Sequence, residues 1–411
     1  MKPGWEIKQI EEMAFIQEGP GIRKYEYQED GFPMINVRCV QDGFLDMSSA
    51  RAANTDLALG KWRHFQVDEG DILFTISGTI GRCAIVTKHD LPLLMNTSVV
   101  RFRSIDPRLD TKFLYLFLQS DGFQLPLKRL SSGAAIQNVG PTHIKMLSIP
   151  VPPLEEQQRI VAILDEAFEG LTLARANAEA NLQNARELFE TYAAAQFDAL
   201  TSDSCVVLSS VTGVALPDKG AIRTGPFGSQ LLHNEFVDEG IAVLGIDNAV
   251  ANKFRWGKSR FITEEKYAQL KRYTVRPGDV IITIMGTCGR CAVVPDNIPL
   301  AINTKHLCCI SLDRTKCLPE YLHHYFLFSP AARSYLSAQA SGSVMDGLNM
   351  GIIKDMPVQL PSIGRQETII ANVSKLQNAA AELIDDYETK LQGLGDLRRS
   401  LLQKAFAGEL T

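Results

Sequence analysis

The chain has no hydrophobic run long enough to cross a membrane and no sign of a secretory leader. Of its 411 residues, 45% are apolar, but no stretch approaches the roughly 20 consecutive apolar residues that a membrane helix needs. The opening residues Met1–Glu6 are not followed by the apolar segment of a signal peptide. We therefore expect a cytoplasmic protein with no membrane partner.

Cysteine is sparse and irregularly placed. Eight cysteines in a chain of this length fit a reducing compartment better than a disulfide scaffold. Cys288 and Cys291 have the spacing of a metal-binding pair, with His306 and Cys308 downstream. In the repeat described below, however, Ile80 stands where Cys288 does, so the first half lacks these ligands. We predict no metal site.

Known catalytic motifs are also missing. The Asn/Asp-Pro-Pro-Tyr/Phe tetrapeptide of adenine amino-methyltransferases is absent, and the only Pro-Pro pair is Pro152-Pro153. Neither a Walker loop nor a Gly-x-Gly-x-x-Gly loop occurs. The seven histidines form no repeated pair with serine or cysteine. We therefore predict that this chain has no catalytic residues and binds no cofactor of its own.

What the chain does have is a long helical pattern from Leu154 to Leu200. Apolar residues recur there at steps of three and four, which is the spacing of one helix face with a single stutter. The positions are Ile160, Leu164, Ala167, Leu171, Ala174, Ala178, Leu182, Ala185, Leu188 and Tyr192. Two prolines precede the pattern, as they often do at a helix start. At about 1.5 Å per residue, this helix would be roughly 65 Å long.

The same pattern occurs a second time. A shift of 209 residues places apolar residues at all ten corresponding positions and maps Gln157 onto Gln366. The second set is Ile369, Val373, Leu376, Ala380, Leu383, Tyr387, Leu391, Leu394, Leu397 and Leu401. A shared spacing at one fixed offset indicates an internal duplication rather than two unrelated helices.

The segments that precede the two helices repeat as well. Short apolar runs alternate with turns in residues 1–152, where strands are predicted at Met34–Val40, Asp71–Ile76, Cys83–Thr87 and Thr97–Phe102, and a helix at Thr111–Leu118. The turn, strand and glycine loop around Asp71 return around Asp279. A polar turn is predicted at Ser131–Ala135, with a counterpart at Ser341–Ser343.

These patterns predict an α+β protein with an internal pseudo-twofold repeat. Two β-rich globular domains are each followed by a long helix, and the two helices pack as an antiparallel coiled coil. The predicted boundaries are 1–152 and 201–361 for the domains, and 153–200 and 362–411 for the helices.

Charge is distributed unevenly along this plan. The net charge is −5, but residues 153–200 hold nine acidic and three basic side chains, whereas the two globular segments are near neutral. The globular parts can therefore carry local basic faces of the kind that phosphate binding needs, although a solvated mixed-charge surface gives the same counts. The acidic first helix suits a protein contact better than a DNA contact.

Two kinds of basic segment are candidates for DNA contacts. Basic and aromatic residues mingle in Lys61–Phe65 and Lys253–Arg260, where they could follow a phosphate backbone and read base edges. Glycine loops at Gly78–Arg82 and Gly286–Arg290 could bring backbone amides to a phosphate, or could simply be tight turns. The candidate DNA-binding residues are Lys61, Arg63, Arg82, Arg255, Lys258, Arg260, Arg290 and Lys305.

With the repeat established, the chain resembles the specificity (S) subunit of type I restriction–modification systems. The resemblance is carried by Pro152–Ile160, by its weaker twin Leu360–Gln366, and by the Gly-Asp turn before each glycine loop. The twin lacks the double proline and has Ile363-Gly364-Arg365 in place of the two glutamates.

The resemblance implies a DNA-reading subunit without chemistry of its own. Each globular domain would be a target-recognition domain that reads one half of a bipartite, asymmetric site on double-stranded DNA. The helices would space the domains and offer docking surface to two modification (methyltransferase) subunits. Those subunits would carry S-adenosylmethionine, and restriction subunits would add ATP- and magnesium-dependent translocation and cleavage.

Three other interpretations remain open. The chain could serve a modification-only or related phage-defence system, because such a system would use the same part. From other classes, it could be a stand-alone nuclease or methyltransferase, against which the missing motifs argue. It could also be a coiled-coil adaptor with no DNA role, which a DNA-binding titration over a salt series would reveal.

The repeat predicts that helix length sets the spacing of the two half-sites. Lengthening both helices by about one turn, roughly 5.4 Å, should widen the preferred gap by one or two base pairs of about 3.4 Å each. Methylome sequencing of cells that carry the variant measures the gap. An unchanged gap, or a change in either half-site, would contradict the idea that the helices act as a ruler.

Overall fold

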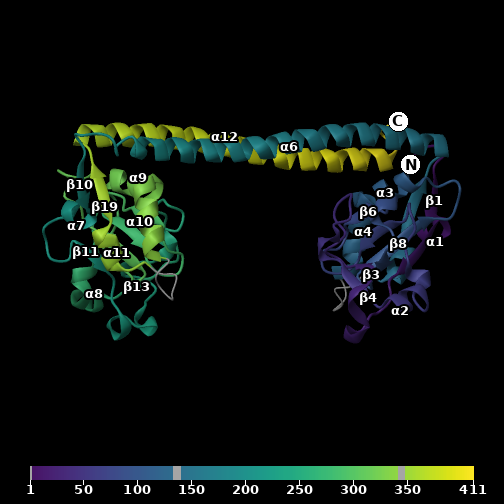
Figure 1. Ribbon diagram of the computed structural model, residues 1–411, viewed down its shortest axis with the longest axis horizontal. Coiled ribbons are helices and arrows are strands. Elements are labelled where there is room, and N and C mark those ends of the chain that lie inside the picture. The colour runs from purple at the N-terminus through teal and green to yellow at the C-terminus, as the bar shows by residue number, and fades with distance from the viewer. Residues whose placement is uncertain (1, 133–139, 341–347) are drawn as a thin grey trace. The chain divides into compact units, whose positions relative to one another are not determined.

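The structure divides into two units, each of which contains parts of both long helices. The computed structural model describes residues 2–132, 140–340 and 348–411 (Figure 1). Unit 1 comprises Met1–Glu179 and Glu388–Thr411, and unit 2 comprises Ala180–Tyr387. The polar turn predicted at Ser131–Ala135 falls largely outside the described residues, and its counterpart at Ser341–Ser343 falls entirely outside them.

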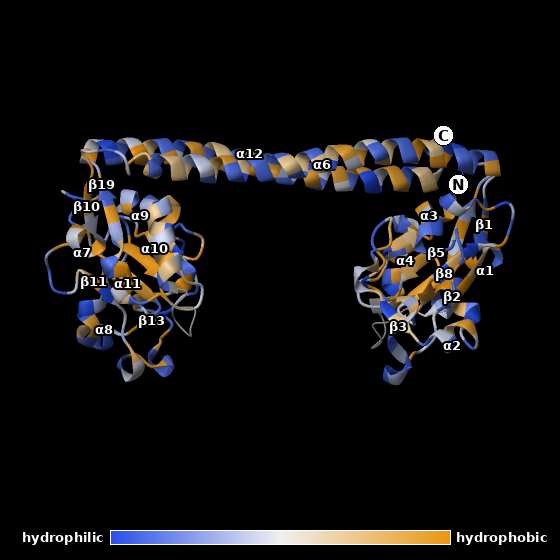
Figure 2. Ribbon diagram, in the orientation of Figure 1, coloured by the Kyte–Doolittle hydropathy of each residue, from blue (hydrophilic) through white to orange (hydrophobic). Residues whose placement is uncertain are grey.

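Unit 1 is built around a four-stranded antiparallel sheet. Its strands in order are β2 (Ala14–Glu18), β8 (Val99–Ser104), β5 (Ile72–Thr75) and β6 (Cys83–Ile85). Alternate residues of β5 serve different clusters: Ile72 and Phe74 pack with the helices, and Leu73 packs toward the second sheet. This period of two explains why β5 is buried on both faces. Figure 2 shows apolar residues gathered on these central strands.

Two smaller sheets and five α-helices complete the described globular part of unit 1. The second sheet contains β4 (Arg51–Ala53), β3 (Tyr27–Ile35) and β7 (Leu94–Met95), and a third pairs β1 (Glu6–Gln9) with β9 (Ser148–Val151). The helices are α1 (Ile10–Met13), α2 (Thr55–Leu59), α3 (Thr111–Gln119), α4 (Asp121–Ser132) and α5 (Pro141–Lys145). The strand predicted over Met34–Val40 ends at Ile35, because the chain turns there and the Cys39 amide donates to the Asn36 carbonyl at 3.0 Å.

Unit 2 repeats this architecture. Its central sheet has the order β11 (Ile222–Thr224), β18 (Leu307–Ile310), β15 (Val280–Thr283) and β16 (Cys291–Val293). The register is the same: Ile72 pairs with Ile85 and Phe102, and Val280, 208 residues later, pairs with Val293 and Ile310. Because a slip of one residue would exchange the two faces of a strand, the shared register confirms the internal repeat.

The remaining elements of unit 2 also follow unit 1, with additions. The second sheet gains a strand and comprises β13 (Phe261–Ile262), β12 (Ile241–Leu244), β17 (Ala301–Asn303) and β14 (Thr274–Val275), while β10 (Val207–Ser210) pairs with β19 (Pro357–Leu360). The helices are α7 (Val211–Val214), α8 (Glu264–Leu270), α9 (Pro319–Phe328), α10 (Pro330–Ala340) and α11 (Met350–Asp355). The α+β prediction is confirmed.

Both long helices are present at the predicted places. They are α6 (Leu154–Asp198) and α12 (Ile363–Ala407). At the start of α6, the buried Gln157 side chain donates to the carbonyls of Arg108 (2.6 Å) and Pro152 (2.8 Å). Its oxygen accepts from the Asp110 amide at 2.9 Å. The glutamine thus ties the helix start to the loop before α3.

Gln366 makes the same three bonds at the start of α12. Its side chain donates to the carbonyls of Lys316 (2.9 Å) and Pro361 (3.0 Å) and accepts from the Leu318 amide at 2.9 Å. It is also fully buried. The glutamines that the sequence paired are therefore equivalent in burial and bonding.

Within each unit, the helix segments run in opposite directions. In unit 1, Ile160 and Leu164 of α6 share a core cluster with Leu402 and Ala405 of α12. Further along α6, the Arg398 guanidinium of α12 lies 4.4 Å from the centre of the Phe168 ring. Residue numbers rise along one helix as they fall along the other, so the segments are antiparallel.

In unit 2, the end of α6 meets the start of α12. Ala193 and Phe197 share a cluster with Ile369 and Val373. Antiparallel packing of the two helices was predicted, and each unit shows it between its own segments.

The predicted apolar face is interrupted near the end of each helix. Leu188 is 65% exposed and Leu397, its counterpart 209 residues later, is 49% exposed. The buried stripe moves to other positions, because Phe197 packs on α9 in unit 2 and Phe406 packs on α3 in unit 1. The last turns of each helix thus face a globular core as well as the other helix.

The glutamine contacts predict a matched pair of stability effects. Replacing Gln157 with Met should lower the free energy of unfolding by about 2–3 kcal/mol, because it leaves buried amide and carbonyl groups without partners. Gln366→Met should cost a similar amount. Urea unfolding monitored by circular dichroism measures both variants. The neighbouring Gln158 is exposed, and Gln158→Met is the control, with a change within about 0.5 kcal/mol. Equal effects at Gln157 and Gln158 would contradict the assigned role.

Candidate nucleic-acid interface

A buried carboxylate lies at the start of the central strand in each unit. Asp71 precedes β5 and Asp279 precedes β15, and each is almost fully buried. Each accepts a backbone bond across its own turn, at 2.8 Å from the amide of Asp68 and of Arg276, respectively. A buried carboxylate needs a cationic partner, and both units supply arginine, from different strands.

In unit 1 the partners come from β8. Arg103 Nε donates to Asp71 Oδ1 at 2.6 Å, and Arg101 Nη1 lies 3.4 Å from Asp71 Oδ2. Arg101 also donates to the carbonyls of Gln66 (2.6 Å) and His64 (3.1 Å). The ion pair therefore anchors the candidate loop Lys61–Phe65 to the core.

This loop exposes its charges around a buried aromatic ring. Trp62 is 2% exposed and fixes the loop between α2 and the 3-10 helix η3 (Arg63–Phe65). Lys61 and Arg63 on either side of it are exposed. The tryptophan thus anchors the loop and leaves two cations facing solvent.

In unit 2 the arginine comes from β11. Arg223 Nη2 donates to Asp279 Oδ2 at 2.6 Å and to the Thr274 carbonyl at 2.5 Å. Thr274 directly follows the 3-10 helix η8 (Lys271–Tyr273), which lies 208 residues after η3. The structural counterpart of η3 is therefore Lys271–Tyr273, whereas the segment Lys253–Arg260 lies elsewhere in unit 2. The only sequence signal was the Lys271-Arg272-Tyr273 tripeptide before the repeated Gly-Asp turn.

The segment Lys253–Arg260 forms a separate basic and aromatic surface. Trp256 is 58% exposed and meets Phe254 edge to face, with ring centres 5.4 Å apart. Asp247 accepts from Arg260 Nη2 and from the Lys258 amide, both at 2.6 Å. The Lys258 side chain and Arg255 remain exposed. Together with strand β12, this segment lines a cavity of about 310 Å³.

Lys305 lies close enough to this surface for its charge and that of Arg260 to act on the same histidine, His306. It occupies the turn between β17 and β18 and is half-buried. The pKa of His306 is lowered, first by burial and then by the positive charges of Lys305 and Arg260. The structure thus places Arg255, Lys258, Arg260 and Lys305 in one region of unit 2.

In each glycine loop, two backbone amides donate hydrogen bonds to the preceding strand and are not free to bind a phosphate. The Gly81 amide donates to the Thr75 carbonyl, and the Arg82 amide donates to Thr75 Oγ1, both at 3.0 Å. Gly289 and Arg290 repeat these bonds with Thr283 at 2.9 Å. Gly78 and Gly286 have φ of 67° and 75°, values that suit glycine. These features favour the tight-turn interpretation over a phosphate cradle.

The two loop arginines have different surroundings. Arg82 is half-buried and donates to Gln41 Oε1 at 3.1 Å. Arg290 is exposed at a cavity of about 370 Å³ that is also lined by Arg333 of α10 and Glu190 of α6. Neither arginine lines the cavity beside Lys258 and Arg260.

Four cysteines of unit 2 are buried in its core: Cys291, Cys308, Cys309 and Cys317. Cys308 and Cys309 are adjacent on β18 and enter different hydrophobic clusters, as alternation along a strand requires. Burial raises the pKa of Cys308 to about 12, so its thiol stays protonated. Among the residues that the structure describes, no group of three or more His, Cys, Asp or Glu side chains is arranged to hold a metal ion.

The adjacent histidines of α9 are also packed into the protein. His323 Nε2 lies 3.0 Å from the Asn252 carbonyl. His324 is 5% exposed, packs against Phe328, and finds no hydrogen-bond partner for Nδ1 among the residues that the structure describes. Burial, followed by the neighbouring His323, lowers the pKa of His324 to about 4.

The described helices contain no segment that is both long enough and apolar enough to span a bilayer. The structure thus shows a repeated fold, long helices whose segments pair within each unit, and exposed basic loops. A family model described as the type I restriction modification DNA specificity domain matches residues 2–182 and 235–392. The chain belongs to this family.

Relatives from bacteria and archaea match along nearly the whole chain. The EcoBI specificity subunit of Escherichia coli is 23% identical, with 99% of this chain and 86% of that protein covered. The EcoKI specificity subunit of E. coli strain K12 is 22% identical (99% and 89% covered). The MjaVIII specificity subunit of Methanocaldococcus jannaschii is 21% identical (95% and 91%). The resemblance to type I specificity subunits is confirmed, and members of this family are non-catalytic parts of type I restriction enzymes.

Solved structures share the fold. A chain from a structure on the assembly and conformational transition of a type I R-M system has a TM-score of 0.77 at 18% identity, with 100% of this chain and 99% of that chain covered. The HsdS subunit from Thermoanaerobacter tengcongensis has a TM-score of 0.58 at 18% identity, with 100% and 98% covered.

The buried histidine predicts acid sensitivity of unit 2. The unfolded chain takes up a proton at His324 near pH 6.5, whereas the folded chain resists until about pH 4. The contribution of His324 to the free energy of unfolding should therefore be fully present above pH 6.5. As the pH falls toward 4, this contribution should be lost, which lowers the free energy of unfolding by on the order of 3 kcal/mol. His324→Phe should flatten this part of the profile in urea unfolding measured between pH 4 and 7. The exposed His233 is the control site, and a His324→Phe profile identical to that of His233→Phe would contradict the prediction.

Proposed function

We propose that this chain reads a bipartite, asymmetric sequence on double-stranded DNA and directs modification subunits to it. One observation carries the proposal: the two units repeat one fold in the same strand register but present different surface segments. Unit 1 presents Lys61–Phe65 beside its buried ion pair, whereas unit 2 adds Lys253–Arg260 and Lys305. Two readers with one scaffold and different loops suit two half-sites of different sequence.

In this proposal the target-recognition domains are residues 1–152 and 201–361. The helical segments 153–200 and 362–411 serve as the spacer and as docking surface for two modification subunits. Exposed leucines on the helices, such as Leu173 (64%) and Leu188 (65%), support a protein contact there. The acidity of residues 153–200 favours a protein partner over DNA at this surface.

In this proposal, the catalytic reactions are carried out by the modification and restriction subunits, not by this chain. S-adenosylmethionine would bind the modification subunits, and ATP and magnesium would serve restriction subunits where these are present. The whole complex would work in the cytoplasm, where the eight described cysteines would stay as the free thiols that the structure shows. A modification-only system is the alternative within this class, because it would require the same DNA-reading part.

Reciprocal charge removal tests the assignment of each domain to one half-site. The double variant Lys61→Gln, Arg63→Gln should weaken binding to the first half-site. The double variant Arg255→Gln, Lys258→Gln should weaken binding to the second half-site. In each case the binding free energy should fall by about 1–3 kcal/mol for each lost base contact. All four side chains are exposed, so folding should be unaffected. Binding of the assembled complex to probes with one half-site randomised measures the effect.

The two pairs of substitutions are matched controls for each other. If both pairs alter recognition of the same half-site, or neither pair alters any, the assignment fails. A separate assay addresses the enzyme alternative: the pure chain is incubated with DNA and S-adenosylmethionine. Methyl transfer or cleavage without partner subunits would contradict the proposal.

A further inference from the structure

Unit 2 contains a basic cavity that none of the predicted DNA-binding residues lines. Its volume is about 420 Å³, and its walls are Leu216–Ala221 on one side and Lys271–Arg276 on the other, with Arg223 and Ser311 between them. Five cationic side chains line it: Lys219, Arg223, Lys271, Arg272 and Arg276. Asp218 is the single carboxylate in the lining. This excess of positive charge points to an anionic ligand.

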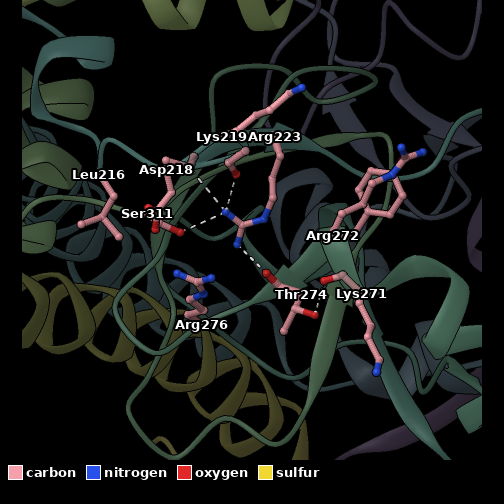
Figure 3. Close-up of a pocket in the computed structure, with 12 residues that line it drawn as sticks. Leu216, Asp218, Lys219, Arg223, Lys271, Arg272, Thr274, Arg276 and Ser311 are labelled. Carbon is pink, nitrogen blue, oxygen red and sulfur yellow. Dashed lines mark hydrogen bonds between the residues drawn. The ribbon is translucent and has the colours of Figure 1, made fainter.

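Arg223 holds the two walls together and cannot be the main ligand-binding group. Its Nη1 donates to the carbonyls of Gly220 and Ala221 (both 3.3 Å) and to Ser311 Oγ (3.0 Å). Its Nη2 bonds to Asp279 and, on the opposite wall, to the Thr274 carbonyl. Figure 3 shows this guanidinium at the centre of the cavity. Arg223 is therefore a positioning residue whose charge is already matched by Asp279.

The other four cations, Lys219, Lys271, Arg272 and Arg276, form the rim of the cavity. They differ from Arg223 because their charges are free to bind an anionic ligand. In the part of the chain that the structure describes, the side chains of Lys219, Lys271 and Arg276 are exposed and have no ion-pair partner. Arg272 lies over the Tyr273 ring at 4.7 Å and donates to Gln230 Oε1 at 3.1 Å. Like charges gathered on one rim repel each other, and a bound polyanion would relieve that repulsion.

Unit 1 does not have this cavity in the same form. The helix α1 leads directly into β2, whereas Ala215–Ala221 separates α7 from β11, so one wall is an insertion in unit 2. At the position of Arg276, unit 1 has Asp68, which pairs with Arg103. The change from Asp68 to Arg276 adds positive charge to unit 2 alone, and the insertion contributes Lys219 to the rim together with Asp218. Lys219 and Arg276 are thus cations that unit 2 adds to the shared fold, and a purely structural role of the cavity would not require them.

We propose that this cavity binds consecutive phosphates of the DNA backbone beside the half-site that unit 2 reads. Lys219 and Lys271 extend from the cavity in opposite directions (Figure 3), an arrangement that follows an extended strand better than it encloses one small anion. Phosphate contacts of this kind position a protein on the duplex without reading sequence. The inference rests on the proposed DNA-binding function and adds a specific set of residues to it.

The test removes two rim charges and counts phosphate contacts. Lys271→Gln with Arg276→Gln in the assembled complex should lower the slope of log K against log salt concentration by about 1.8, because each contact contributes about 0.9. The recognised sequence should not change. Lys24→Gln with Lys88→Gln is the matched control, since both lysines are exposed and lie outside the cavity, the long helices and the candidate DNA-binding residues, and its slope should equal that of the wild type. Equal melting temperatures check that all variants are folded.

The outcomes separate this proposal from the general function. If the wild type binds DNA and the cavity variant has the same slope, the phosphate site is wrong while the proposed function stands. If the wild-type complex does not bind DNA, both fail. Calorimetric titration with inorganic phosphate adds a further outcome: phosphate binding that the cavity variant loses, with an unchanged DNA slope, would assign the cavity to a small anion and overturn the proposal.

Discussion

The packing of each long helix's last turns against a globular core is the contact on which the rest of the structure depends. In unit 1, Phe406 of α12 lies 5.1 Å from Phe113 and 5.4 Å from Phe117 of α3, measured between ring centres. In unit 2, Phe197 of α6 makes the equivalent contacts with Tyr321 and Tyr325 of α9 at 5.8 and 5.6 Å. Each core is therefore completed by the start of one long helix and the end of the other, and neither copy of the repeat buries its apolar surface with its own helix alone. Aromatic pairs of this kind add to the free energy of simple burial, so this contact stabilises the fold at the point where the two copies of the repeat meet.

A second constraint is the buried aspartate that opens each central strand. The two units keep the carboxylate and its turn but supply the arginine from different strands, from β8 in unit 1 and from β11 in unit 2. What the fold requires is a cation near the carboxylate, since an unpaired charge there would be strongly destabilising. In both units the same arginine also fixes the carbonyls of an adjoining basic segment. The stability of the core and the placement of the surface cations are thus connected through one residue, Arg101 or Arg223.

Belonging to the type I specificity family explains why so much of the chain is scaffold. The repeated elements carry the strand register, the glutamine contacts and the glycine turns, and these are the parts that match between units. The differences are concentrated in exposed segments: the loop around Trp62, the segment around Trp256 and the insertion before β11. Loops on a rigid scaffold can change without cost to the core, which is how one fold can present two unlike binding surfaces.

The sequence determined the repeat, the two long helices and the order of strands, because these depend on local periodicity and on a nearly constant offset. It also identified Gln157 and Gln366 as equivalent, and the structure gives them identical bonds. The interruption at Leu188 and Leu397 was not predictable, because the last turns of each helix pack on a globular core that helix periodicity does not encode. The equivalence of Arg63–Phe65 and Lys271–Tyr273 was hidden for a similar reason, because the arginines that bind next to them come from non-equivalent strands and reach the same place only after folding. Local pattern therefore established the framework, whereas contacts between residues far apart in the chain decided which charges share a surface.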